Sequence, residues 1–210
     1  MKINTNKWNK FRYTLYTPWY DLLGRYFRDP REKSVASLEI KPGDKVLIIG
    51  SGTGLDLEFI PAFCEIYVTD ITPSMIGKVI KRNKILKLNV QAMVMDGQAL
   101  EFPDNSFDKI ILHLILAVIP DPIKCIRESE RVLKQGGQIA VFDKFVPKDR
   151  KVSITRRFVN VFANFFFTDV TRSFESIAGE TGLTVIQDLD AGFNGNFRRL
   201  KLVQRPLVTK

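Results

Sequence analysis

A hydrophobic run that ends in three glycines at alternate positions constrains the fold of this chain more than any other feature. Val46–Ile49 reads as a strand, and Gly50, Gly52 and Gly54 follow it directly before a helical pattern begins. Glycines at such a turn let the backbone bend sharply and let a ligand lie against it without interference from Cβ atoms. The dinucleotide-binding form of the motif needs Gly or Ala at position 55, where this chain has Leu55. The form present here suits an adenosine ligand that has no pyrophosphate.

Short β-branched runs alternate with helical patterns between residues 45 and 145, which predicts an α/β fold with a parallel sheet covered on both faces. The predicted strands are Val46–Ile49, Ile66–Thr69, Val90–Met95, Ile110–Leu114 and Ile139–Phe142. The predicted helices are Leu55–Phe63, Ser74–Leu86 and Pro122–Leu133. Two further strands, joined by a glycine-containing loop, predict an antiparallel hairpin at the end of the chain: Thr184–Leu189 and Arg198–Gln204.

Acidic residues stand at the ends of the second and third predicted strands. Asp70 lies 20 residues after Gly50. An acidic residue at this separation along the chain stands at the end of the second strand, where its carboxylate can accept hydrogen bonds from ribose hydroxyls. The alternative for Asp70 is a cap for the helix that follows. Asp96 follows the third strand, where its carboxylate could accept from an adenine amino group. The small residues Gly97 and Ala99 would leave room for the ring.

These motifs, followed by Phe107-Asp108 and by Arg131–Gly137, resemble the class I S-adenosylmethionine-dependent methyltransferases of the broad type 11 group. The resemblance implies a Rossmann-like sheet of seven mostly parallel strands, with the last strand antiparallel. It implies S-adenosylmethionine as the cofactor and S-adenosylhomocysteine as the product. The glycine loop would face the methionine part, Asp70 the ribose, and residues 96–99 the adenine. The implied cofactor-binding residues are Gly50, Ser51, Gly52, Gly54, Asp70, Ile71, Met75, Asp96, Gly97, Gln98, Ala99 and His113.

Three shorter segments resemble narrower groups. Gly54-Leu55 with Ile60-Pro61, and Val118–Pro122, are similar to bacterial phosphatidylethanolamine N-methyltransferases of the soluble type. Tyr16–Asp21 resembles an aromatic segment that those enzymes share with ubiquinone/menaquinone C-methyltransferases. Ile48 stands where many relatives carry an acidic residue that helps to hold the methionine amine. A module that binds S-adenosylmethionine without catalysis is therefore an alternative function.

Positive charge is concentrated in two segments. The net charge is +9, of which residues 1–33 and residues 144–157 carry +5 each, leaving −1 for the rest of the chain. Such segments suit anionic partners such as lipid head groups or nucleic acid, although solvated basic faces give the same pattern. The segment after the fourth strand reads His113–Leu116 and lacks the polar, proline-rich motif of base-amine methyltransferases. A nucleic-acid substrate is therefore not expected.

Large apolar residues recur at helical spacing in the first basic segment. This segment belongs to an N-terminal part (residues 1–40), which we distinguish from a methyltransferase domain (residues 41–210). The stripe consists of Trp8, Phe11, Leu15, Trp19, Leu22 and Tyr26, with a break or restart near Pro18. A basic helix with this stripe could lie in a membrane interface, or it could pack as a lid over the cofactor site. Both roles are compatible.

The second basic segment leads into a similar stripe of Phe158, Phe162, Phe165 and Phe166. Aromatic residues beside arginines would suit an acceptor that has an apolar tail and a phosphate, whereas a core helix beside a basic loop is the alternative. The candidate acceptor-binding residues are Tyr16, Tyr20, Arg156 and Arg157.

The candidate catalytic residues are Tyr20, which would help to close the site, and His113, the only histidine. An imidazole at the end of the fourth strand could take a proton from the acceptor. We favour the simpler interpretation that His113 packs beside the adenosine, since methyl transfer from a sulfonium is a direct displacement that positioning can accelerate.

The remaining features indicate a cytoplasmic protein, peripheral at most at the inner face of a membrane. The chain has no apolar run of 18 residues and no signal-peptide pattern, and Cys64 and Cys125 lack metal or redox spacing. No metal is expected. The predicted function is methyl transfer to a small or lipid acceptor, with phosphatidylethanolamine as the leading acceptor and a quinone precursor as the alternative.

Overall fold

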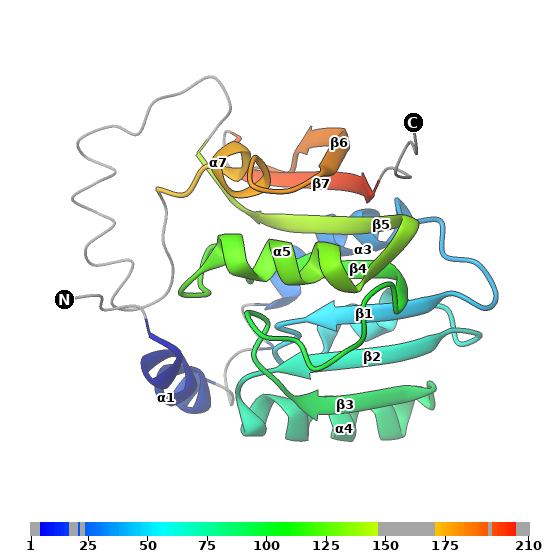
Figure 1. Cartoon of the computed structure of the whole chain (residues 1–210). Helices are drawn as coiled ribbons and strands as arrows, with labels where there is room; N and C mark the ends of the chain where they lie inside the picture. Colours follow the sequence, from blue (N-terminus) through cyan, green and yellow to red (C-terminus); the bar gives the residue numbers. More distant parts are fainter. Residues whose placement is uncertain (1–4, 17–20, 22–23, 147–170, 193–194, 205–210) are drawn as a thin grey trace.

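The computed structural model describes residues 5–16, 21, 24–146, 171–192 and 195–204, and its centre is one seven-stranded sheet. The strand order is β3-β2-β1-β4-β5-β7-β6 (Figure 1). Strands β1 to β5 are parallel, and β7 runs antiparallel to both β5 and β6. The predicted fold, including the antiparallel C-terminal pair, is therefore confirmed. The strands are β1 Lys45–Ile49, β2 Glu65–Asp70, β3 Val90–Val94, β4 Phe107–His113, β5 Leu133–Lys144, β6 Leu183–Asp190 and β7 Phe197–Gln204.

Helices cover both faces of this sheet. One apolar core lies under α5 and α7, and the other under α3, η2 and α4. Helix α1 lies beside the carboxyl ends of the parallel strands (Figure 1). None of the described helices has the length and apolar composition needed to cross a membrane. The helices are α1 Asn6–Tyr16, η1 Arg25–Phe27, α3 Arg28–Ala36, η2 Leu55–Phe59, α4 Pro73–Leu86, α5 Pro122–Val132 and α7 Phe174–Ala178.

The predicted helix Leu55–Phe63 is shorter than expected. The structure has only a 3-10 helix, η2, over Leu55–Phe59, and Ile60 is already extended at φ −94° and ψ 130°. Pro61 explains the early end, because a proline disfavours the helical conformation in the residue before it. Helices α4 and α5 begin as predicted, each with a proline in the first turn. The chain after η2 therefore turns directly into β2.

A buried polar cluster joins α3 and η2 to the sheet. The Asp56 carboxylate of η2 accepts from the Arg31 guanidinium of α3 at 2.7 Å and lies 2.8 Å from His113 Nδ1 of β4. His113 Nε2 is 2.9 Å from the Ser34 hydroxyl of α3. Burial raises the pKa of Asp56, but the charges and hydrogen bonds of Arg31 and His113 outweigh burial and hold the pKa well below its usual value. The Asp56 carboxylate therefore stays ionised at neutral pH, and the cluster ties α3, η2 and β4 together.

We predict that Arg31→Met destabilises the fold by about 3–5 kcal/mol, because it leaves the Asp56 carboxylate buried without its cation. The matched control is Arg127→Met, which breaks an ion pair whose side chains are 56% and 50% exposed. The control is expected to cost less than about 1 kcal/mol. Urea unfolding measures both values. Equal losses in the two variants would contradict the importance of the buried pair.

A second buried carboxylate, Asp143 at the end of β5, holds the loop that follows β4. Its two oxygens accept from the backbone N–H of Ala117 at 2.9 Å and of Lys144 at 2.7 Å. Burial raises the pKa of Asp143 to about 6, although these hydrogen bonds lower it. The folded chain therefore keeps this proton to a higher pH than the unfolded chain does.

We predict a specific pH dependence from Asp143. Because the pKa rises from 3.8 to about 6 on folding, its contribution to stability falls as the pH rises between these values and is level above them. Asp143→Asn removes this titration. The free energy of unfolding of the variant minus that of the wild type should therefore increase by at most about 3 kcal/mol between pH 4 and pH 6. Asp29→Asn, an exposed control, should show no such change. A constant difference between Asp143→Asn and wild type would refute the prediction.

Candidate active site

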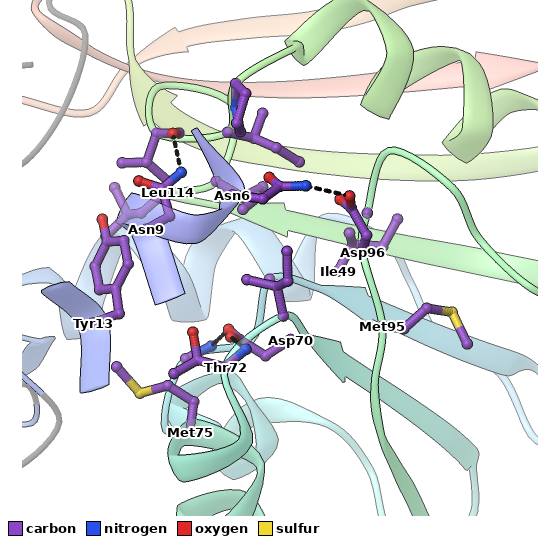
Figure 2. A pocket seen from close by; sticks show the side chains of 18 residues that line it. Asn6, Asn9, Tyr13, Ile49, Asp70, Thr72, Met75, Met95, Asp96 and Leu114 are labelled. Carbon is purple, nitrogen blue, oxygen red and sulfur yellow. Dashed lines mark hydrogen bonds between the residues drawn. The ribbon is translucent and has the colours of Figure 1, made fainter. Parts of the chain in front are cut away.

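A pocket opens at the carboxyl ends of β1 to β4, where α1 crosses its mouth (Figure 2). Strand ends supply its floor: Ile49-Gly50 from β1, Asp70-Ile71 from β2, and Met95–Gly97 from β3. One wall comes from the loop after β4, with Leu114-Ile115 and Val118–Pro120, and the other from Asn6, Asn9 and Tyr13 of α1. Ligands in open α/β sheets bind at this edge, beside the point where the strand order reverses. The reversal here lies between β1 and β4.

The glycine loop has a backbone that other residues adopt only under strain. Gly50, Gly52 and Gly54 have φ values of +67°, +56° and +80°. A Cβ atom at Gly50 would lie 2.5 Å from Ile115 Cδ1 on the opposite wall, so only glycine leaves space there. The turn therefore keeps its backbone exposed to the pocket, as the sequence pattern predicts.

Asp70 connects this loop to the start of α4. One carboxylate oxygen accepts from the Gly52 N–H at 2.9 Å, and the other accepts from the Thr72 N–H at 2.8 Å. Burial raises the pKa of Asp70, against the hydrogen bonds from Thr72 and Gly52 that lower it. Each oxygen keeps a second lone pair for a ligand hydroxyl. Thr72, not Asp70, is the residue that precedes α4 as its cap.

Asp96 receives hydrogen bonds from its own loop and from α1. Its Oδ1 accepts from the Gln98 N–H at 3.0 Å, and its Oδ2 accepts from the Asn6 amide at 2.6 Å (Figure 2). The Gln98 amide also donates to Asn6 Oδ1 at 3.1 Å. A Cβ at Gly97 would lie 2.7 Å from Ile49 Cγ2, so the chain is tightly packed where it passes the end of β1. Helix α1 is thus docked directly on the carboxylate predicted to contact adenine.

The wall after β4 is held from two sides. Asn9 of α1 donates its amide N–H to the Val118 carbonyl at 3.1 Å. From below, Asp143 holds the Ala117 N–H. The loop begins at Leu114, whose φ of +57° is unusual for a residue with a branched side chain. Residues 114–120 therefore form a supported wall between α1 and the sheet.

The structure brings seven of the predicted cofactor-binding residues to the pocket: Gly50, Gly52, Asp70, Ile71, Met75, Asp96 and Gly97. The other five are not part of its lining: Ser51, Gly54, Gln98, Ala99 and His113. Gln98 contacts the pocket indirectly through Asp96 and Asn6. His113 lies below the floor with both ring nitrogens facing Asp56 and Ser34. Ile48 is 1% exposed and packs in the core beneath α3, away from the pocket.

Several predicted residues lie outside the described part of the chain. These residues are Tyr20, Arg156 and Arg157, together with the stripe of Phe158, Phe162, Phe165 and Phe166. Tyr16 is the last residue of α1. Sequence reasoning missed Asn6, Asn9 and Tyr13, which lie at helical spacing on the face of α1 opposite its exposed Phe11 and Leu15. This polar stripe could have been recognised from its spacing.

The residues present fit an adenosyl ligand. Its ribose and adenine offer hydroxyl and amine donors, and the pocket supplies the carboxylates of Asp70 and Asp96 as acceptors. The side-chain oxygen of Thr72 is buried and has no hydrogen-bond partner in the described chain. Gly50 and Gly52 line the pocket with bare backbone, without Cβ atoms.

The amino-acid sequence is similar to known methyltransferases. Residues 47–141 match a family described as a methyltransferase domain. The chain is 24% identical over 197 residues to phosphatidylethanolamine N-methyltransferase of Cereibacter sphaeroides, covering 90% of this chain and 96% of that protein. It is 36% identical over 115 residues to the ubiquinone/menaquinone biosynthesis C-methyltransferase UbiE of Stenotrophomonas maltophilia, covering 52% of this chain and 46% of that protein. The chain thus aligns with about half the length of the UbiE protein.

The fold is similar to solved methyltransferase structures. A SAM-dependent methyltransferase from Aquifex aeolicus superposes with a TM-score of 0.62 at 20% identity, covering 83% of this chain and 89% of that one. The domain match and the similarity to named methyltransferases support S-adenosylmethionine-dependent methyl transfer as the activity of this chain, and the solved structure shows that the chain has a methyltransferase fold.

Proposed function

We propose that this enzyme methylates a lipid acceptor at a membrane surface, and that the acceptor is the amine of phosphatidylethanolamine. The observation that carries the proposal is the orientation of α1. Its polar residues Asn6 and Asn9 face the cofactor pocket. Its apolar residues Phe11 and Leu15 are 64% and 66% exposed to solvent. A helix that packs by its polar face and exposes its apolar face suits a second, apolar medium on its outer side.

Charge supports the same orientation. Lys7 and Lys10 are exposed on α1, beside the apolar residues. Lysines at the edge of an apolar stripe attract anionic head groups while their alkyl chains reach along the surface. The similarity to phosphatidylethanolamine N-methyltransferase, which extends over most of both chains, favours a lipid amine as the acceptor.

The pocket residues are assigned roles by their chemistry. Asp70 would accept from the ribose hydroxyls and Asp96 from the adenine amine, while Gly50 and Gly52 leave room for the methionine part. When bound, S-adenosylmethionine supplies an activated methyl group on a sulfonium. The protein then has to hold the acceptor in line and exclude water. The partners of His113 support a structural role for this residue rather than that of a base.

Helix α1 would act as a lid. With α1 in place, the cavity between the walls is about 60 Å³, well below the range of about 300–1,000 Å³ typical of small-molecule pockets. S-adenosylmethionine is too large for this cavity and can enter only if α1 shifts. Such a shift breaks the contacts of Asn6 and Asn9. The residues of α1 that would touch a membrane therefore belong to the same helix that closes the pocket.

The alternative acceptor is a quinone precursor, favoured by the higher identity to UbiE over the shared 115 residues. A vesicle assay separates the two acceptors. The purified protein is incubated with methyl-labelled S-adenosylmethionine and vesicles of bacterial lipid extract, and the organic phase is counted and chromatographed. Label in phospholipid supports the proposal, whereas label in the quinone fraction supports the alternative. Absence of label, with cofactor binding intact, would refute a lipid acceptor.

We predict that Asp70→Asn weakens S-adenosylhomocysteine binding at least tenfold, about 1.4 kcal/mol or more. An amide has one oxygen, so it cannot accept from Gly52, Thr72 and two ribose hydroxyls together. Isothermal titration calorimetry measures the affinity, and thermal unfolding confirms that the variant folds. Asp104→Asn, at an exposed carboxylate, is the control and should bind normally. A folded Asp70→Asn variant with unchanged affinity would exclude the ribose role.

We also predict that Phe11→Ser/Leu15→Ser abolishes most labelling of vesicle lipid while leaving S-adenosylhomocysteine affinity within about twofold, because these side chains point away from the pocket. The matched control is Ile80→Ser/Ile85→Ser, which removes two exposed apolar side chains, 48% and 81% exposed, from α4. Vesicle flotation and label incorporation are the measurements. Equal effects of the two double variants would argue against α1 as the membrane contact.

A further inference from the structure

Four arginines converge on a second pocket, which shares no lining residue with the cofactor pocket. Arg25 comes from η1, Arg28 and Arg31 come from α3, and Arg82 comes from α4. We call this cavity, which measures about 400 Å³, the arginine pocket. Its apolar lining is supplied by Leu55 and Phe59 of η2. The volume is sufficient for a small polar ligand.

The acidic residues around this pocket do not balance its arginines. Glu58 is shared, because its two oxygens pair with Arg28 and with Arg82. Asp21 pairs with Arg82 at 2.9 Å, and Asp56 pairs with Arg31 beneath the wall. Among the residues that the structure describes, four guanidinium groups thus meet three carboxylates, which leaves a formal charge of +1.

The unbalanced charge lies at the accessible side of the pocket. The side chain of Arg25 is exposed and makes no hydrogen bond or ion pair with any residue that the structure describes. Arg28 is 58% exposed and uses one nitrogen for Glu58, so its other N–H groups remain available. Two neighbouring guanidinium groups can therefore donate to one ligand.

The remaining walls keep this arrangement in place. The Arg28 guanidinium lies over the Phe59 ring at 4.9 Å from its centre, which holds the planar group against an apolar surface. Arg82 is fixed by Glu58, Asp21 and the Thr53 carbonyl. A guanidinium group held in this way offers a fork of donors that matches the oxygens of a phosphate, and it is desolvated more easily than an ammonium group.

We propose that the arginine pocket binds a phosphate group through Arg25 and Arg28. The phosphate belongs either to a lipid head group or to a soluble phosphate ester. This inference goes beyond methyl transfer and does not depend on the identity of the acceptor, since the two pockets have separate linings. At a membrane, the site would hold a phosphate other than the one next to the reacting amine.

The test uses the full chain and inorganic phosphate as the probe, at constant ionic strength. We expect saturable binding that Arg25→Gln/Arg28→Gln weakens at least tenfold. The control Lys124→Gln/Arg127→Gln removes the same charge from exposed positions on α5 and should leave affinity within about twofold. Both Arg25 and Arg28 are exposed, so the variant is expected to fold, and thermal unfolding checks this. Equal weakening in both double variants, or no saturable binding to wild type, would overturn the proposal.

The source of the phosphate follows from competition. If inorganic phosphate displaces the protein from phosphatidylglycerol vesicles, and Arg25→Gln/Arg28→Gln lowers vesicle binding, the pocket takes a lipid phosphate. If phosphate binds but vesicle binding is unaffected, the pocket takes a soluble ester. Asp70→Asn, designed to impair the cofactor site, should retain phosphate binding. A failure of methyl transfer can therefore be distinguished from a failure of this pocket.

Discussion

The position of α3 on the sheet depends on one buried charge, the carboxylate of Asp56. This group would be costly to bury alone, and the structure compensates it with Arg31 and His113. Because Arg31 belongs to α3 and His113 to β4, the pairing fixes α3 against the sheet. The arginine pocket is built on α3 and η2, so its geometry depends on the same carboxylate. The only histidine of the chain is thereby used for structure.

Much of the fold follows from local patterns that the sequence displays. Buried parallel strands read as short apolar runs, and prolines mark the starts of α4 and α5, so these elements were predictable to within a few residues. The glycine loop and Asp70 were equally visible, because their spacing along the chain is set by one β-α-β unit. The apolar pattern over Leu55–Phe63 predicts too long a helix, because Pro61 ends η2 at Phe59.

The rest of the site depends on contacts between distant segments. Asn6 reaches Asp96 across 90 positions in the sequence, and His113 reaches Asp56 and Ser34 across 57 and 79. No local period encodes such pairs. The aromatic stripe of α1 predicted an amphipathic helix but not which face would pack inward. The structure shows that the amide-bearing face packs, because Asp96 and the Val118 carbonyl offer partners to Asn6 and Asn9.

The composition of the cofactor pocket has a consequence for how the reaction would respond to acidity. Among the described residues that line it, only Tyr13, Asp70 and Asp96 can ionise, and the two carboxylates already accept hydrogen bonds from the loops around them. A tyrosine keeps its phenolic proton near neutrality, and both ring nitrogens of His113 lie against Asp56 and Ser34. An amine acceptor would then find no base for its proton among these described lining residues. The pH–rate profile would consequently follow the ionisation of the substrate rather than that of these protein groups.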